Sequence, residues 1–256
     1  MRPNPVKQAL QEGKVQLGCA FAQLRSPEIP RILKAAGFHW AFVDTEHGNF
    51  DLETVQDLCR VSSLIGFCPI VRVTDLQYHL VARSLDVGAE GIVFPRVESP
   101  ELLAKAIRWV KFPPEGDRGF GLTTAAVNYA KASMPEIADH MNRNLLVVVQ
   151  IETQRGIDAR DEILSVPGVD ALMVGPADLS FSLGVPGDFQ HTKMVDAMDK
   201  LVETCNKHKV APGTQTRTLP LATFWRDRGM RFLGCSSETG MMLEKATEIA
   251  NQLLEK

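Results

Sequence analysis

Short apolar segments alternate with helix-like segments along the whole chain, and this alternation most constrains its fold. Eight segments have the length and composition of strands: residues 16–22, 40–45, 68–73, 91–96, 145–152, 170–175, 209–214 and 231–236. Most are apolar on both faces, which indicates a parallel sheet covered by helices. Ser26, Asp51 and Ser99 stand where N-caps of the intervening helices are expected.

Eight strand–helix units in 256 residues predict an α/β fold, namely a closed (β/α)8 TIM barrel that forms a single domain over residues 1–256. A doubly wound open sheet is the alternative. Such a sheet usually carries a glycine-rich turn after its first strand, and residues 22–26 contain no glycine. A Gly/Pro-rich insert at 113–132 precedes the fifth strand, and inserts of this length are usually functional or packed on a partner. The last helical segment, residues 238–255, should cover the barrel or a neighbouring subunit.

The composition is typical of a globular protein, with 45% apolar and 23% charged residues and a net charge of −3. This charge gives no sign of a nucleic-acid partner or of an anionic membrane surface. The five cysteines form no CxxC pair, which favours buried reduced thiols and a cytoplasmic location. The first residues lack the apolar stretch of a signal peptide, and no segment approaches the ~18 apolar residues of a membrane span.

Two carboxylates stand where successive predicted strands end, Glu152 as the last residue of the fifth and Asp178 three residues beyond the sixth. The carboxyl ends of barrel strands meet at one face, so these side chains should be neighbours. Each alone fits a salt-bridged carboxylate or a helix N-cap. Together they match the oxygen ligands that Mg²⁺ prefers, with water and substrate in its other positions. Gln150 shares a strand face with Glu152. The pair therefore predicts a divalent metal site, and a structural zinc is not expected because no cysteine lies near it.

Polar side chains also end the second and third predicted strands. Asp44 precedes His47 by three residues, a spacing at which a carboxylate can orient an imidazole as a general base, although DxxH alone also fits a loop histidine. Arg72 would be costly to bury unpaired, so it should face an anion or a carboxylate. No lysine stands at the carboxyl end of a predicted strand. A Schiff base is therefore not expected, and carbonyl chemistry would rely on a metal.

With these residues in place, the chain resembles the HpcH/HpaI aldolases, which are class II, metal-dependent pyruvate aldolases of the phosphoenolpyruvate/pyruvate barrel superfamily. The resemblance covers almost the whole chain. It rests on residues 36–48, 69–73, 85–95, 118–121, 150–153 (Gln-Ile-Glu-Thr) and 174–180 (Val-Gly-Pro-Ala-Asp-Leu-Ser).

The resemblance implies a metal-bound 2-oxo acid. Glu152 and Asp178 would bind Mg²⁺ or Mn²⁺, with Co²⁺ or Zn²⁺ as other candidates. Pyruvate or a related 2-oxo acid would chelate this ion through its carboxylate and ketone oxygens. Gln150 and the backbone at Ala177 and Asp178 would hold that substrate, and Arg72 would stabilise the enolate oxygen.

The resemblance also implies a base and an assembly. His47 would be the base, acting directly or through a metal-bound water, with Asp44 and Asp86 tuning it and Glu46 behind it. The insert around Arg118–Leu122 would reach a neighbouring active site. The barrels would assemble as hexamers with exchanged C-terminal helices.

The leading hypothesis is reversible retro-aldol cleavage of a 4-hydroxy-2-oxo acid, either a 4-hydroxy-2-oxo-dioate or a 2-keto-3-deoxy sugar acid. The products would be pyruvate or hydroxypyruvate and an aldehyde. Polar residues near strand seven, Thr214, Gln215 and Arg217, favour a short hydroxylated or anionic aldehyde. A CoA-ester lyase of the citrate/malyl type is the alternative enzyme, but no basic cluster for CoA is evident. A barrel retained for protein interaction is the non-enzymatic alternative, and the intact polar set argues against it.

Overall fold

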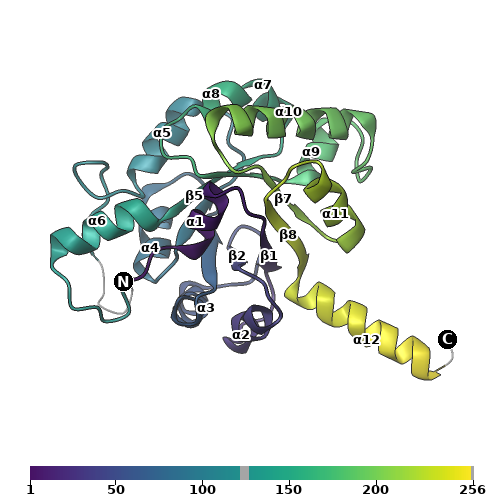
Figure 1. Ribbon diagram of the computed structural model, residues 1–256, viewed down its shortest axis with the longest axis horizontal. Helices are drawn as coiled ribbons and strands as arrows, with labels where there is room; N and C mark the ends of the chain where they lie inside the picture. Colours follow the sequence, from purple (N-terminus) through teal and green to yellow (C-terminus); the bar gives the residue numbers. More distant parts are fainter. Residues whose placement is uncertain (122–126, 255–256) are drawn as a thin grey trace.

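The computed structural model describes residues 1–121 and 127–254, and its strands form a closed parallel barrel in the order β1 to β8 (Figure 1). The strands are β1 Gln16–Phe21, β2 Trp40–Asp44, β3 Cys68–Arg72, β4 Gly91–Phe94, β5 Leu146–Ile151, β6 Ala171–Val174, β7 Gly213–Thr216 and β8 Phe232–Ser237. β8 pairs with β1 in parallel, which closes the sheet. The predicted (β/α)8 barrel is confirmed, and the open doubly wound sheet is excluded.

Most helices surround the barrel on its outer side, whereas α1 crosses one end of it and α12 projects away (Figure 1). The helices are α1 Pro5–Gln11, α2 Glu28–Ala35, α3 Leu52–Ile65, α4 Tyr78–Asp86, α5 Pro100–Arg108, α6 Met134–Asn144, α7 Gln154–Asp158, α8 Arg160–Leu164, α9 Pro176–Ser182, α10 Thr192–His208, α11 Leu219–Asp227 and α12 Glu238–Leu254. Two predicted caps are confirmed, because Asp51 accepts from the backbone N–H of Thr54 and Ser99 from that of Leu102. At α2 the residue directly before the helix is Pro27, and the Ser26 hydroxyl accepts from the backbone N–H of Glu28.

The seventh strand begins later than predicted. Residues 209–214 were expected to form it, but β7 spans Gly213–Thr216 and is preceded only by an isolated bridge from Ala211 to Ala171. Lys209 caps α10 in the left-handed region with φ 59°, and Pro212 has no N–H to donate to a ladder. The apolar residues here therefore lead into the strand without forming it.

Large apolar side chains fill the barrel interior. Trp40 and Phe232 stack with ring centroids 4.1 Å apart, and both are fully buried. Gly18 on β1 makes room for them, since a Cβ there would lie 2.1 Å from the Trp40 ring. This packed layer fills the lower barrel interior, which favours a site at the carboxyl ends of the strands.

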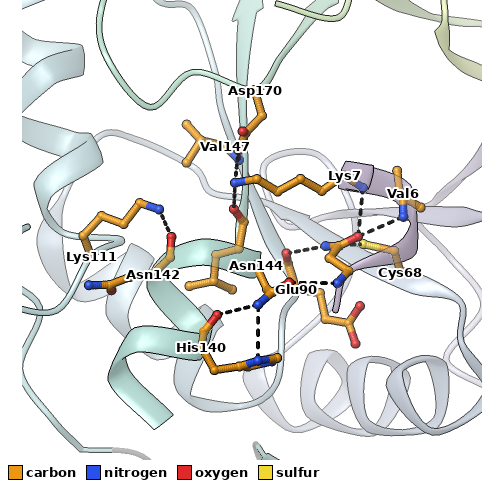
Figure 2. A network of polar contacts seen from close by, with 12 residues as sticks. Val6, Lys7, Cys68, Glu90, Lys111, His140, Asn142, Asn144, Val147 and Asp170 are labelled. Carbon is orange, nitrogen blue, oxygen red and sulfur yellow. Dashed lines mark hydrogen bonds and ion pairs between the residues drawn. The ribbon is translucent and has the colours of Figure 1, made fainter. Parts of the chain in front are cut away.

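A network of polar contacts holds α1 across the amino-terminal end of the barrel (Figure 2). The Asn4 side chain accepts from the backbone of Val6 and Lys7 and donates to the Glu90 carbonyl. The Lys7 ammonium contacts Asp170 at 3.0 Å and the Leu145 carbonyl at 2.9 Å. Val6 and Leu10 of α1 are buried against the interior core. These contacts therefore fix α1 to the amino-terminal end of the barrel.

The last helix, α12, extends away from the barrel (Figure 1). Apolar side chains along it are exposed in the single chain: Met242, Leu243, Ile249, Leu253 and Leu254. No helix in the described part of the chain is long and apolar enough to cross a membrane.

Candidate active site

A cavity of about 530 Å³ opens among the carboxyl ends of the strands. Six of the residues selected from the sequence line it: Asp44, His47, Arg72, Gln150, Ala177 and Asp178. Glu152 is just behind this wall, next to Gln150 and Gly175. The fold therefore brings seven of the eight predicted site residues to one place, and Asp86 is the exception.

A buried ion pair joins the second and third strands. Asp44 and Arg72 are register partners on β2 and β3, so both point inward at the same level. The Asp44 carboxylate accepts from Arg72 Nε at 2.9 Å and from Nη2 at 2.6 Å. Each side chain is only 9% exposed. Arg72 thus faces carboxylates, as its burial required, and its orientation is fixed by a bidentate contact.

A second carboxylate continues this network. Glu46 Oε2 is 3.0 Å from Arg72 Nη1, and Glu46 Oε1 is 2.6 Å from Arg96 Nη2. The Glu46 side chain is 7% exposed, whereas that of Arg96 is 62% exposed. Two carboxylates and two guanidinium groups therefore alternate from the cavity wall to the rim, and their formal charges cancel.

The predicted contact between Asp44 and the His47 imidazole is absent. Asp44 Oδ1 accepts instead from the backbone N–H groups of Glu46 and His47, at 3.0 and 3.2 Å. Within the described residues the His47 ring has no hydrogen-bond partner and lines the cavity. The expectation failed because Asp44 points inward to Arg72, its neighbour across the strands. Asp44 thus shapes the loop that carries His47, and the imidazole is left facing the cavity.

Glu152 is 2% exposed and its two oxygens are held separately. Oε1 accepts from the backbone N–H of Arg96 at 3.0 Å, and Oε2 from the Gln150 amide at 2.6 Å. Burial raises the pKa of Glu152, the hydrogen bond from Gln150 opposes this, and the negative charge of Asp178 raises the pKa further. Such a carboxylate gains from a nearby cation.

Two observations show that this corner fits a divalent cation. Glu152 Oε2 and the Gln150 amide lie against Gly175, three residues before Asp178, and Gly175 and Asp178 line the same cavity. The Gln150 Oε1 atom is buried without a partner, so it adds an unused oxygen beside Glu152. No group of three or more His, Cys, Asp or Glu side chains gathers as a metal site within the described residues, so the protein would supply only part of the coordination shell. Two carboxylates with open positions for water and substrate suit Mg²⁺ or Mn²⁺.

The lack of a side chain at Gly175 allows the Glu152 carboxylate to lie close to the backbone there. A Cβ at this position would lie 2.3 Å from Glu152 Oε2 and 2.8 Å from the Gln150 amide nitrogen. Gly175 directly precedes α9, which carries Ala177 and Asp178 into the cavity wall. The Val-Gly-Pro-Ala-Asp sequence therefore serves both the close approach and the placement of Asp178.

Asp86 is not brought to the cavity of its own chain, and its role in tuning His47 stays a prediction. It is the last residue of α4, outside the barrel, and pairs with Arg118 at 2.7 Å. Arg118 is 1% exposed, with its guanidinium 4.6 Å from the centre of the Phe112 ring. This residue of the insert therefore packs on its own barrel, and Leu122 lies outside the described residues.

Two residues of the site carry contacts that sequence reasoning did not assign. Arg96 bridges Glu46 and Glu152, as described above. Glu238 Oε1 accepts from three successive backbone N–H groups, those of Ala22, Gln23 and Leu24, at 2.9, 2.6 and 2.9 Å. Their only signal in the sequence is a charged side chain at or just beyond the end of a predicted strand.

Comparison with known proteins agrees with this geometry. Residues 17–244 match the family model HpcH/HpaI aldolase/citrate lyase. A hydroxypyruvate/pyruvate aldolase of Paraburkholderia phytofirmans is 33% identical over 97% of this chain and 96% of its own. A 5-keto-4-deoxy-D-glucarate aldolase of Salmonella paratyphi C is 30% identical over 97% and 96%.

The fold comparison points the same way. The solved HpcH/HpaI aldolase from Desulfitobacterium hafniense superimposes with a TM-score of 0.92 at 29% identity, covering 98% of this chain and 96% of that one. Solved citrate lyases are more distant, at 14% and 15% identity, and share the fold alone. The chain therefore belongs to the HpcH/HpaI aldolase/citrate lyase family.

Proposed function

We propose that this chain is a class II aldolase that reversibly cleaves 4-hydroxy-2-oxo acids into a 2-oxo acid and an aldehyde. One observation carries the proposal: Arg72, His47 and Asp178 line a single cavity at the strand ends, and Glu152 lies directly behind Gln150 in its wall. The same cavity has no lysine among its described lining residues, which disfavours a Schiff base.

Glu152 and Asp178 would hold a divalent cation, Mg²⁺ or Mn²⁺, with Co²⁺ and Zn²⁺ as other candidates. When bound, such an ion supplies Lewis acidity to the ketone oxygen of the substrate. Gln150 and the backbone at Ala177 and Asp178 would orient the substrate carboxylate and ketone.

The chain's own residues then account for the remaining chemistry. His47 accepts the proton of the C4 hydroxyl, the C3–C4 bond breaks, and C4 leaves as the aldehyde. The bonding electrons move towards C3 and the C2 oxygen, and the negative charge there faces Arg72. Because Asp44 and Glu46 hold this guanidinium in place, it does not need to reorganise as the charge develops. A proton returned to C3 completes the 2-oxo acid.

The donor that we propose is pyruvate or hydroxypyruvate, because the relatives are named for hydroxypyruvate/pyruvate and for 5-keto-4-deoxy-D-glucarate. Gln215 and Arg217 line the cavity near β7, which supports a short hydroxylated or anionic aldehyde. A CoA-ester lyase is the less favoured function. Arg72 is ion-paired, and Arg217 is the other arginine in the described lining, so a basic site for the CoA pyrophosphate lacks support.

We also propose that residues 1–256 act as one aldolase domain within a homo-oligomer, a hexamer, that exchanges α12 between subunits. The apolar side chains exposed along α12 support this arrangement, since a lone helix would gain from burying them. All five cysteines are free thiols, which supports a cytoplasmic location.

The test is an assay of pyruvate and hydroxypyruvate release from a panel of 4-hydroxy-2-oxo acids, with and without a chelator. We expect release that stops with chelator, returns with Mg²⁺ or Mn²⁺, and is lost in His47→Ala. Release that survives the chelator would exclude the class II mechanism. Release from none of the panel would favour the lyase.

A further inference from the structure

Arg96 contacts both halves of the proposed site without lining its cavity. Its backbone N–H donates to Glu152 Oε1 at 3.0 Å, and its guanidinium donates to Glu46 Oε1 at 2.6 Å. Glu152 belongs to the proposed metal site, whereas Glu46 contacts Arg72, the arginine that is proposed to face the substrate. One residue thus connects the proposed metal ligand to the group that faces the substrate.

The backbone of Arg96 is held in an unfavourable conformation. Its φ is 47°, a region that non-glycine residues seldom adopt and that persists where surrounding contacts fix it. Two contacts with β5 and its end do so here. The N–H of Arg96 binds Glu152, and the next N–H, that of Val97, donates to the Gln150 carbonyl at 3.0 Å. The turn after β4 is therefore shaped to aim an amide at Glu152.

The side chain of Arg96 balances charge beside Arg72. Asp44 and Glu46 present two negative charges to the single positive charge of Arg72, and Arg96 supplies the second positive charge. Without it, the buried Glu46 carboxylate would be neutralised by Arg72 alone. The net field of Arg72 towards an anionic substrate would then be weaker.

We propose that Arg96 is a positioning residue with two separable parts: its backbone orients Glu152 for the cation, and its side chain keeps Arg72 available to the 2-oxo acid. This inference rests on the proposed aldolase function. It predicts that a substitution can damage one part and spare the other.

Substitution of Arg96 by glycine and by alanine separates the backbone part from the side-chain part. Glycine adopts a positive φ at no steric cost, so Arg96→Gly keeps the amide in place and removes only the side chain. Alanine removes the same side chain but keeps the strained φ, and without the Glu46 contact only the two backbone hydrogen bonds oppose that strain, so the turn can relax and withdraw the amide. Arg96→Lys retains a positive charge towards Glu46. Arg155→Ala is the matched control, because Arg155 is an exposed arginine whose ion pair is with Glu98.

Two readouts follow the two parts. Direct Mn²⁺ binding to the full-length protein, measured by electron paramagnetic resonance of the free Mn²⁺, reports on Glu152. The KM for pyruvate in the aldol direction at saturating Mn²⁺ reports on Arg72. We expect Arg96→Gly to bind Mn²⁺ within about threefold of wild type and Arg96→Ala to bind about tenfold more weakly. Both should raise the KM for pyruvate about tenfold, and Arg96→Lys should recover most of that loss.

Each outcome has a meaning. Equal Mn²⁺ affinity in Arg96→Gly and Arg96→Ala overturns the backbone part, and an unchanged KM for pyruvate in both overturns the side-chain part. Equal losses in Arg155→Ala would show that an exposed arginine without these contacts has the same effect, and would overturn both parts. If the wild-type protein shows no Mn²⁺ binding that depends on Glu152, both the proposed function and this inference are overturned.

Discussion

The ion pair between Asp44 and Arg72 should be among the strongest polar contacts in the barrel, and Asp44→Asn tests it with little change of shape. The substitution removes the negative charge and places an amide NH₂ where a carboxylate oxygen now accepts from Arg72. Asn retains an oxygen for the backbone N–H groups of Glu46 and His47. The loop should therefore survive while the buried guanidinium loses its main partner.

The expected magnitude follows from burial and geometry. Arg72 makes two hydrogen bonds to Asp44, at 2.9 and 2.6 Å, and both side chains are 9% exposed. Removing one partner of a buried ion pair costs about 3 to 5 kcal/mol. Glu46 still holds Arg72 Nη1, so we expect the lower end, a loss of about 3 kcal/mol in the free energy of unfolding. Activity should fall by at least about a hundredfold, as when one donor to a developing oxyanion is lost.

The assay is urea denaturation at fixed protein concentration, with Asp199→Asn as the control. Asp199 makes the same bidentate contact with Arg228, but on the exposed surface, so its loss should leave stability nearly unchanged. The double variant Asp44→Asn with Arg72→Met should be clearly less destabilised than the sum of the two single variants. Equal effects of Asp44→Asn and Asp199→Asn, or strict additivity in the double variant, would refute this account of the pair.

Three further results are expected. Gly175→Ala places a Cβ 2.3 Å from Glu152 Oε2, so calorimetry should show Mn²⁺ affinity falling at least about tenfold; unchanged affinity would separate Glu152 from the metal. Burial raises the pKa of Glu90 above its ordinary 4.5, so its contribution to stability is present below pH 4.5 and is lost as pH rises through the raised value. Glu90→Gln should reduce that decline in thermal unfolding, and an unaltered pH profile would contradict the assignment. Glu238→Ala leaves the backbone N–H groups of Ala22, Gln23 and Leu24 without their acceptor. It should lower the free energy of unfolding in urea by at least about 3 kcal/mol, and Glu238→Gln should lower it less. A loss below about 1 kcal/mol in Glu238→Ala would contradict that role.

The barrel could be predicted because its strands are apolar on both faces and are bounded by caps and turns. β2 and β3 each end one residue before the predicted limit. β7 was misplaced because residues 209–212 are nearly as apolar as a strand, whereas the left-handed Lys209 and the missing N–H of Pro212 keep them out of the ladder. That difference cannot be inferred from apolar composition alone.

The site could be predicted to the extent that it depends on the ends of strands. The two-residue period put Gln150 and Glu152 on one face, and the structure joins them by a hydrogen bond of 2.6 Å. The partner of Asp44 could not be predicted, since the register between β2 and β3 selects Arg72 over the nearby His47. The contacts of Arg96 depend on a positive φ, and an arginine in the sequence does not indicate such a backbone conformation.

Glu152, Asp178 and Arg72 should together stabilise negative charge on a 2-oxo acid, and exchange of the C3 protons of pyruvate with D₂O tests this without an aldehyde. Proton NMR should show loss of the pyruvate methyl signal with wild-type protein and Mg²⁺ or Mn²⁺. The exchange should stop with chelator and in Glu152→Gln, and it should slow at least about a hundredfold in Arg72→Met. Exchange that continues at the wild-type rate with chelator, or in Glu152→Gln with metal present, would contradict the account.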